Sequence, residues 1–496
     1  HNTVPLFVNY VLERKHTSGT ESSGGVCVNK RKGNVKNSIS VHIFLGDSLV
    51  TNDTGVEHHP QNIPDEIGYD RIRDAFRSKS EIAYQGAVQR LDNKRTHLKQ
   101  NPKPADNAAV PEFKRMPPAV WIGPSALTNP CPVTDMEQLS NRLSKVFSDY
   151  PELFNHCVKV YQKRVDYYRL TSEGQKILQP DTAFHITARA SIKTDGNEVK
   201  TEYYRLHVGG INDLPSEDAL IGELHQFAQY MRQKSRAKAV EDLYIGPVLY
   251  EDDAAMELLA RKIADHSHSY WISIRNQSDR KHRYLGKQVF PPALSVCQLG
   301  SDSVYNGVKL LGYRQVDADG TKPMTLPIIE KGILKHMLTG RTPSLGCPAS
   351  TGNEHFDGLS RSLETRYIAG VFHVTSNRPV PYSKLYKRFL KAAKKAGLEH
   401  TYIIRKNRTS PYALIRVDLS TGKEELVEGN YNAPSREQFK RMHAISKEEN
   451  VYNLDPAGGK GLGIISPKAI LLEDMELDIT PSRARHIDEA FYELRH

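Results

Sequence analysis

Residues 246–266 read GPVLYEDDAAMELLARKIADH, and this stretch decides the fold. A short apolar run ends at Tyr250 and gives way to an acidic triplet, Glu251 to Asp253. Behind the triplet, apolar residues recur every three to four positions, as one buried face of a helix requires. The carboxylate of Asp252 or Asp253 can satisfy free N–H groups of the first helical turn and complement the helix dipole. The stretch therefore predicts a strand, an acidic turn and a buried helix near the middle of the chain.

Residues 246–249 and the alanine-rich helix behind them resemble the central signature of the TldD/PmbA family of metallopeptidase-like proteins, often labelled modulators of DNA gyrase. For TldD-type members the resemblance implies a zinc motif, His-Glu-x-x-x-His, on this helix. In this chain the His-Glu pair falls on Ala260 and Arg261, and the second His falls on Asp265. A methyl group cannot bind zinc, and a protonated guanidinium cannot act as a general base.

The family's second zinc feature is a cysteine in a Cys-Gly-Lys turn near the C-terminus. The matching segment here is 457–461, and Gly458 stands at the cysteine position. His266 comes one position after the expected second ligand, about 100° further around the helix. A catalytic zinc needs about three protein ligands and an open position. The resemblance therefore implies a PmbA-like member with no metal ion and no other cofactor.

Two further site hypotheses come from the residues themselves. His266 and His268 follow the helix two positions apart, with His282 further on, and such a pair on a loop can bind a metal. In a chain with 20 histidines, a polar surface is the simpler interpretation. Cys347 lies near His355 and could act as a nucleophile, although the sequence shows no third group to orient them. An active hydrolase that uses other residues therefore stays open.

The loop at 339–359 is the predicted substrate-binding segment. It is polar, contains Gly and Pro, and follows a tight reversal at 330–332, an order that also resembles the family. Loops in such positions commonly hold binding residues. We predict that Arg341 is available to a substrate carboxylate and that Asn353 and His355 are available for hydrogen bonds; no catalytic residue is assigned.

Composition restricts the class of protein. The 496 residues suffice for two or three domains, and no apolar run is long enough to predict a transmembrane helix. The net charge of +10 permits nucleic-acid binding, but the cations are interleaved with acids, which favours a solvated basic surface. Five cysteines without a C-x-x-C motif indicate free thiols. The expected location is cytoplasmic, or periplasmic or secreted if a signal segment was removed before His1.

The predicted fold is α+β, with a mixed α/β N-terminal domain at 1–244 and a mainly antiparallel β domain at 245–496, as in the family. The resemblance extends from about residue 40 to about residue 480. Strands are expected at 38–50 and from 158 to 206. Helices are expected at 68–98, 134–147, 219–239 and 384–397, the second of them opened by a capping box from Thr134 to Glu137.

These observations predict a TldD/PmbA-type peptidase homologue that binds or processes extended polypeptide and acts as a PmbA-like partner or scaffold subunit. It is expected to form a homodimer, or a heterodimer with a TldD-like subunit, with one subunit covering the substrate cleft of the other. No membrane partner is expected. The alternative is a basic protein that binds nucleic acid or associates with gyrase, which the charge and the family's label weakly favour.

Overall fold

The computed structural model describes residues 3–52, 61–64, 68–103, 108–194, 198–267, 281–300, 302–343, 346–353, 370–410, 412–454 and 461–480. It confirms the α+β class, with helices packed on sheets in which most strand pairs are antiparallel. No helix within these ranges is long and apolar enough to span a membrane.

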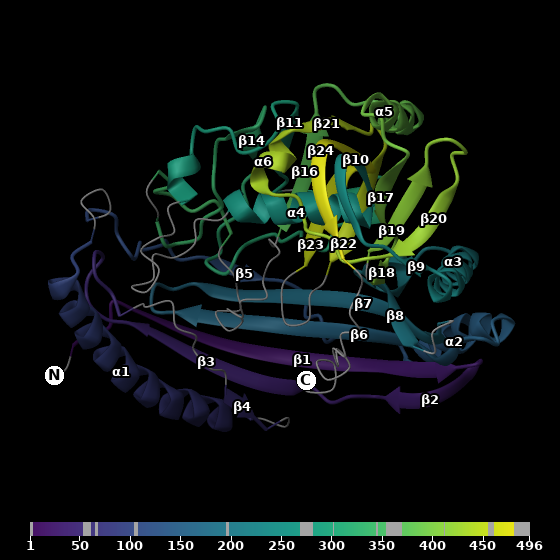
Figure 1. The fold of residues 1–496 in the computed structure, drawn as a ribbon. Coiled ribbons are helices and arrows are strands. Elements are labelled where there is room, and N and C mark those ends of the chain that lie inside the picture. Colours follow the sequence, from purple (N-terminus) through teal and green to yellow (C-terminus); the bar gives the residue numbers. More distant parts are fainter. Residues whose placement is uncertain are drawn as a thin grey trace.

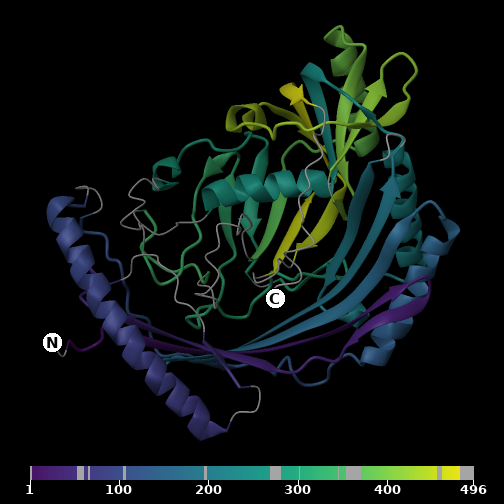
Figure 2. The same ribbon diagram turned by 60° about the horizontal axis from the view of Figure 1, so that its bottom comes forward.

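One large sheet is built almost entirely from strands of the first half of the chain (Figure 1). Its five central strands are all antiparallel to their neighbours and lie in the order β8-β7-β6-β1-β3. Figure 2 shows that these long strands curve and that the C-terminal elements lie on the inner side of the curve. Nine strands within the described ranges belong to this sheet: β1 (Phe7–Ser23), β2 (Val26–Arg31), β3 (Lys36–Phe44), β4 (Gln61–Ile63), β5 (Val120–Ile122), β6 (Phe154–Thr171), β7 (Lys176–Lys193), β8 (Val199–Val208) and β18 (Thr409–Ser410).

Three helices cover the sheet because its strands alternate apolar and polar residues. The helix α1 (Tyr69–Gln100) packs Ala87 and Leu91 against Val41 and Ile43 of β3. The helices α2 (Val133–Ser144) and α3 (Glu217–Ser235) share a second core with β6, β7 and β8, next to the short 3-10 helices η1 (Lys145–Asp149) and η2 (Ile211–Asp213). All three helices lie where the sequence predicts them.

The capping box predicted at Thr134 to Glu137 is wrong. The helix α2 begins at Val133 with Pro132 at the N-cap, and no side chain caps it. The hydroxyl of Thr134 instead donates to Asp135 Oδ1 at 3.3 Å. Pro132 holds φ at −58°, and the helix begins two residues earlier than it would behind a Thr134 cap.

Two further sheets make up most of the C-terminal half. The first has seven strands in the order β21-β24-β10-β17-β19-β20-β9, and the second has six in the order β15-β14-β11-β16-β23-β22. Their bounds are β9 (Lys238–Ala239), β10 (Asp242–Asp252), β17 (His400–Lys406), β19 (Ala413–Asp418), β20 (Glu424–Glu428), β21 (Met442–Ile445) and β24 (Ala469–Ile479), then β11 (Leu294–Gln298), β14 (Leu326–Glu330), β15 (Ile333–Leu334), β16 (Gly370–Ser376), β22 (Glu449–Leu454) and β23 (Leu462–Pro467). A separate hairpin joins β12 (Val304–Tyr305) to β13 (Val308–Lys309).

The reversal predicted between β14 and β15 is confirmed. Lys331 and Gly332 both have positive φ, of 47° and 81°, which is typical of a two-residue hairpin turn. Ahead of β14, Tyr313 to Val316 is not a strand.

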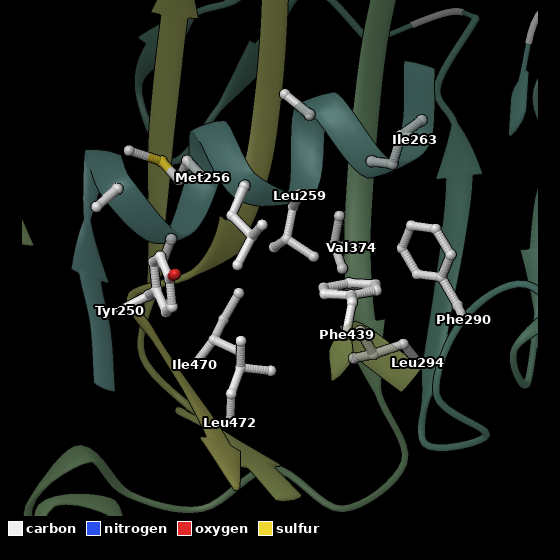
Figure 3. Close-up of a cluster of buried hydrophobic side chains, with 14 of the residues drawn as sticks. Tyr250, Met256, Leu259, Ile263, Phe290, Leu294, Val374, Phe439, Ile470 and Leu472 are labelled. Carbon is white, nitrogen blue, oxygen red and sulfur yellow. The ribbon is translucent and has the colours of Figure 1, made fainter. Parts of the chain in front are cut away.

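The helix α4 (Asp253–Ser267) lies in the largest apolar core of the described chain (Figure 3). Both C-terminal sheets contribute to this core, for example through Tyr250 and Ile470 from one and Leu294 and Val374 from the other. The opposite face of the seven-stranded sheet is covered by α5 (Tyr382–Lys395). Two short helices, η3 (Lys281–Tyr284) and α6 (Arg436–Lys440), complete the set.

The predicted division between residues 244 and 245 falls inside β10. Each half also contributes a strand to a sheet of the other half. The strand β9 pairs with β20 of the C-terminal half, and β18 pairs with β8 of the N-terminal half. The two-domain division stays a prediction.

Candidate functional site

The junction between β10 and α4 is built from two acids. Asp252 has a φ of 55°, a left-handed conformation that Asp tolerates better than most residues, and this bends the chain from strand into helix. Asp253 then begins α4 and accepts a hydrogen bond from the backbone N–H of Arg408 at 2.7 Å. Burial raises the pKa of both carboxyl groups, that of Asp253 to about 6.

The position expected for the first zinc ligand is part of the apolar core. Ala260 is 0% exposed, and its neighbours Leu259 and Ile263 are equally buried (Figure 3). The next residue, Arg261, is half-buried and lies near enough to Tyr431 to affect the pKa of that phenol. A methyl group and a guanidinium do not fit a zinc ion.

The remaining ligand positions cannot be placed in the same way. The backbone of Asp265 and His266 is helical, since α4 continues to Ser267. His268 and Gly458 lie outside the described residues. Within the described ranges, no group of three or more His, Cys, Asp or Glu residues could hold a metal ion.

Glu257, one turn before Ala260, is the centre of a buried polar cluster. Its carboxylate is 4% exposed and accepts hydrogen bonds from Lys406 Nζ at 2.6 Å, from Tyr452 Oη at 3.1 Å and from the hydroxyl of Tyr412. The ammonium group of Lys406 also lies 5.0 Å from the centre of the Tyr412 ring. Three donors satisfy this buried carboxylate, and two of them come from β17 and β22, so the cluster holds α4 to these strands.

Tyr250 is a buried phenol of the α4 core. Its side chain is 4% exposed, and its hydroxyl has no hydrogen-bond partner within the described part of the chain. Burial alone raises the pKa of the phenol. The hydroxyl is therefore a desolvated polar group inside the α4 core.

The strand β22 links the Glu257 cluster to a sheet edge. It pairs with β23 on one side and is the last strand of the six-stranded sheet within the described residues. Tyr452, which donates to Glu257, belongs to this strand. Edge strands expose backbone N–H and C=O groups that can pair with a further extended chain.

Arg341 lies away from α4, between the N-terminal sheet and the C-terminal half. Its side chain is 5% exposed, with Nη2 at 2.9 Å from Glu173 and Nε at 2.9 Å from Asp319. Its guanidinium also lies 4.0 Å from the centre of the Phe7 ring. Two carboxylates of the chain itself thus stand where the sequence predicts a substrate carboxylate, and the buried pair with Glu173 connects the two halves of the molecule.

The other residues of the predicted substrate loop give a partial picture. Asn353 is half-buried, and its Nδ2 donates to the carbonyl and the hydroxyl of Thr351 at 3.0 and 2.9 Å. His355 lies outside the described residues, so the Cys347–His355 pair is not tested; Cys347 itself is a half-buried cysteine that packs against the α4 core. A substrate-binding role for Arg341, Asn353 and His355 stays a prediction.

Sequence reasoning missed Glu257, Lys406, Tyr412 and Tyr452. One signal was available, because an acid at position 257 interrupts the buried face between Ala254 and Leu258. Its partners lie 149 to 195 residues away in sequence, so no local pattern could identify them.

Comparisons with known proteins agree with this picture. A sequence profile for the PmbA/TldA metallopeptidase C-terminal domain matches residues 245–373. No match was found among curated proteins. The fold is similar to that of a proposed modulator of a DNA gyrase from Thermotoga maritima, with a TM-score of 0.59, 13% identity and coverage of 95% of this chain and 96% of that one.

Two other solved structures are similar over the same extent. TldE from Thermococcus kodakarensis has a TM-score of 0.58 and 10% identity, with 95% of this chain and 96% of that chain covered. A second proposed modulator of DNA gyrase, from Bacteroides thetaiotaomicron, has a TM-score of 0.59 and 12% identity, with 96% and 95% covered. At such identities these likenesses concern the fold.

Proposed function

The chain belongs to the TldD/PmbA family, and on this premise we propose that it is a peptidase homologue that binds extended polypeptide without a zinc ion or other cofactor of its own. The observation that carries this proposal is the burial of Ala260 in the apolar core of α4. At that position the family resemblance calls for a ligand that points into an open site.

The polypeptide would bind by backbone pairing at the edge strand β22. Such pairing recognises an extended chain with little regard to its side chains. Tyr452 ties this strand to Glu257, and thereby to α4, so the edge is held rigidly by a buried cluster. Asn353 and His355 remain proposed contacts. Arg341 would join them only by exchanging Glu173 for a substrate carboxylate.

As a PmbA-like subunit, the chain would act as a partner or scaffold. We propose a dimer, formed either with a second copy or with a TldD-like subunit, in which the partner covers the bound polypeptide. Light scattering at micromolar concentration tests the homodimer, since one chain has a mass of 55.9 kDa. Co-purification with a TldD-like protein tests the heterodimer, and a mass of one chain in both experiments would overturn the dimer.

Peptide binding tests the function itself. A labelled, neutral, unfolded peptide should bind in a fluorescence anisotropy titration, and a metal chelator should not change its affinity. The same peptide with N-methyl groups along its backbone should bind about tenfold more weakly, because it cannot donate the hydrogen bonds of strand pairing. Loss of binding on addition of the chelator, or equal binding of both peptides, would contradict the proposal.

A further inference from the structure

The helix α5, labelled at the top of Figure 1, presents a single row of exposed cations to solvent. Its apolar residues Leu385, Phe389 and Ala393 are buried against the seven-stranded sheet. Its other face is exposed, contains no acid, and forms no ion pair with any residue the structure describes. The row consists of Lys384, Lys387, Arg388, Lys391, Lys394 and Lys395.

This row is held in place by the side of the helix that faces the protein. The Tyr382 hydroxyl donates to Glu251, and the Tyr386 hydroxyl donates to Glu424 at 3.0 Å. Arg405 in turn pairs with both of these carboxylates, at 2.7 and 3.3 Å. These contacts fix the position of α5 on the sheet. Its cations lie on one face without acidic partners, so they repel one another unless an anion binds.

We propose that the cationic row of α5 is a docking surface for an acidic segment of the polypeptide that the protein binds. This inference deepens the proposed function and rests on it. The six cations span twelve residues of helix, and the eleven steps from Lys384 to Lys395 cover about 16 Å at 1.5 Å per residue. An extended peptide of about five residues covers this length.

Acids near α5 favour a short peptide over a long polyanion. Glu448 accepts a hydrogen bond from the Tyr382 backbone at the first turn, Glu424 lies on one flank, and Glu399 follows four residues after the last cation. A nucleic-acid duplex continues past the row with one charge per about 1.7 Å, so its phosphates would meet these acids. A run of Asp or Glu residues can end where the cations end.

Charge-removal variants on two helices test the inference. Four exposed lysines of α5 are changed to glutamine, which keeps the helix propensity and removes the charge. A matched control removes four exposed charges from α1, where acids are interleaved with the cations. The test variant is Lys384→Gln, Lys387→Gln, Lys391→Gln and Lys394→Gln, and the control is Arg71→Gln, Arg77→Gln, Arg95→Gln and Lys99→Gln.

Each full-length protein is titrated with a labelled peptide containing a run of glutamates, with the neutral unfolded peptide and with a short DNA duplex. The α5 variant should bind the glutamate peptide about fifteenfold more weakly, because four exposed pairs are lost at about a factor of two each, while the α1 variant should change by less than about twofold. Neutral-peptide binding should be the same in all three proteins. If the wild-type protein does not bind the neutral peptide, the proposed function is contradicted. The comparison of glutamate-peptide affinity between the wild type and the α5 variant can still be made.

Equal losses in both variants would overturn the inference, since general charge would then explain them. So would wild-type protein that does not bind the glutamate peptide, or an α5 variant that loses affinity for the duplex but not for the glutamate peptide.

Discussion

The helices α4 and α5 pack on opposite faces of the same sheet. They differ in whether the side that faces away from this sheet is buried or exposed. Alternate residues of β10 and β17 point to each helix: Tyr250 and Ile404 belong to the α4 core, whereas Leu249 and Ile403 belong to the α5 core. A second sheet also packs against the α4 core, so α4 is buried nearly all round from Asp253 to Ala260, while α5 keeps a cationic face in solvent. The helix that carries the family resemblance is thus the one with no exposed face from Asp253 to Ala260.

The largest expected losses of stability come from α4, and they should be similar for side chains on different sides of this helix. Leu258→Ala and Leu259→Ala should each lower the free energy of unfolding by about 2–4 kcal/mol, because both side chains leave cavities in a packed core. On α5, Leu385→Ala should have a similar cost, whereas Lys387→Ala should change stability by less than about 0.5 kcal/mol. Urea unfolding of the four variants measures this. A small effect of Leu258→Ala would mean that α4 has an open face.

The Glu257 cluster should depend on charge more than on shape. Glu257→Gln keeps the size of the side chain but leaves the Lys406 ammonium without its counter-charge, and should cost about 2–3 kcal/mol in unfolding free energy. Tyr452→Phe removes one donor to the same carboxylate and should cost about 1 kcal/mol. If the two variants are equally stable in urea, the cluster is not organised around an anion.

Asp253 gives α4 a dependence on pH. The folded-state pKa of about 6 is above the usual value near 3.8, so the native state keeps the proton that the unfolded state releases. Stability is then lost as pH rises from about 4 to about 6, by about 2 kcal/mol. Asp253→Asn should remove this loss. The unfolding free energy of the variant relative to that of the wild type should therefore increase between about pH 4 and about pH 6 and stay higher above about pH 6. A constant difference in unfolding free energy between pH 4 and pH 7 would contradict the assignment.

The smallest effect is expected at Tyr250. Its hydroxyl is desolvated without a partner within the described residues, so Tyr250→Phe should raise the unfolding free energy by about 1 kcal/mol or leave it unchanged. A clear loss of stability in thermal or urea unfolding would show that the hydroxyl makes a bond that stabilises the fold.

The sequence predicted what depends on local patterns. The strand–helix unit at β10 and α4, the helices α1 and α3, and the reversal at Lys331 and Gly332 follow from hydrophobic spacing and from glycine's tolerance of positive φ. Cap chemistry was less reliable. The capping box lies at Ser435 and Gln438 in α6, not at Thr134, because a Ser/Thr-x-x-Glu/Gln pattern does not by itself fix where a helix begins.

The candidate site was less accessible to sequence reasoning. Family resemblance located Ala260, but the partners of Glu257 come from strands far along the chain, and their positions follow from sheet topology. Arg341 shows the same limit. A loop arginine next to Gly and Pro suggested an exposed ligand-binding group, yet tertiary packing places it against Phe7 and pairs it with two acids. The amino-acid type of a loop residue does not reveal its burial.

The central proposal is that α4 is a packed core and binds no zinc at Ala260. Elemental analysis of the purified protein, after incubation with zinc and exhaustive dialysis, tests it most directly. The account predicts far less than one zinc per chain, because Ala260 offers no ligand atom and its surroundings are closed. About one zinc per chain, retained through dialysis and released together with peptide-binding activity by a chelator, would contradict it.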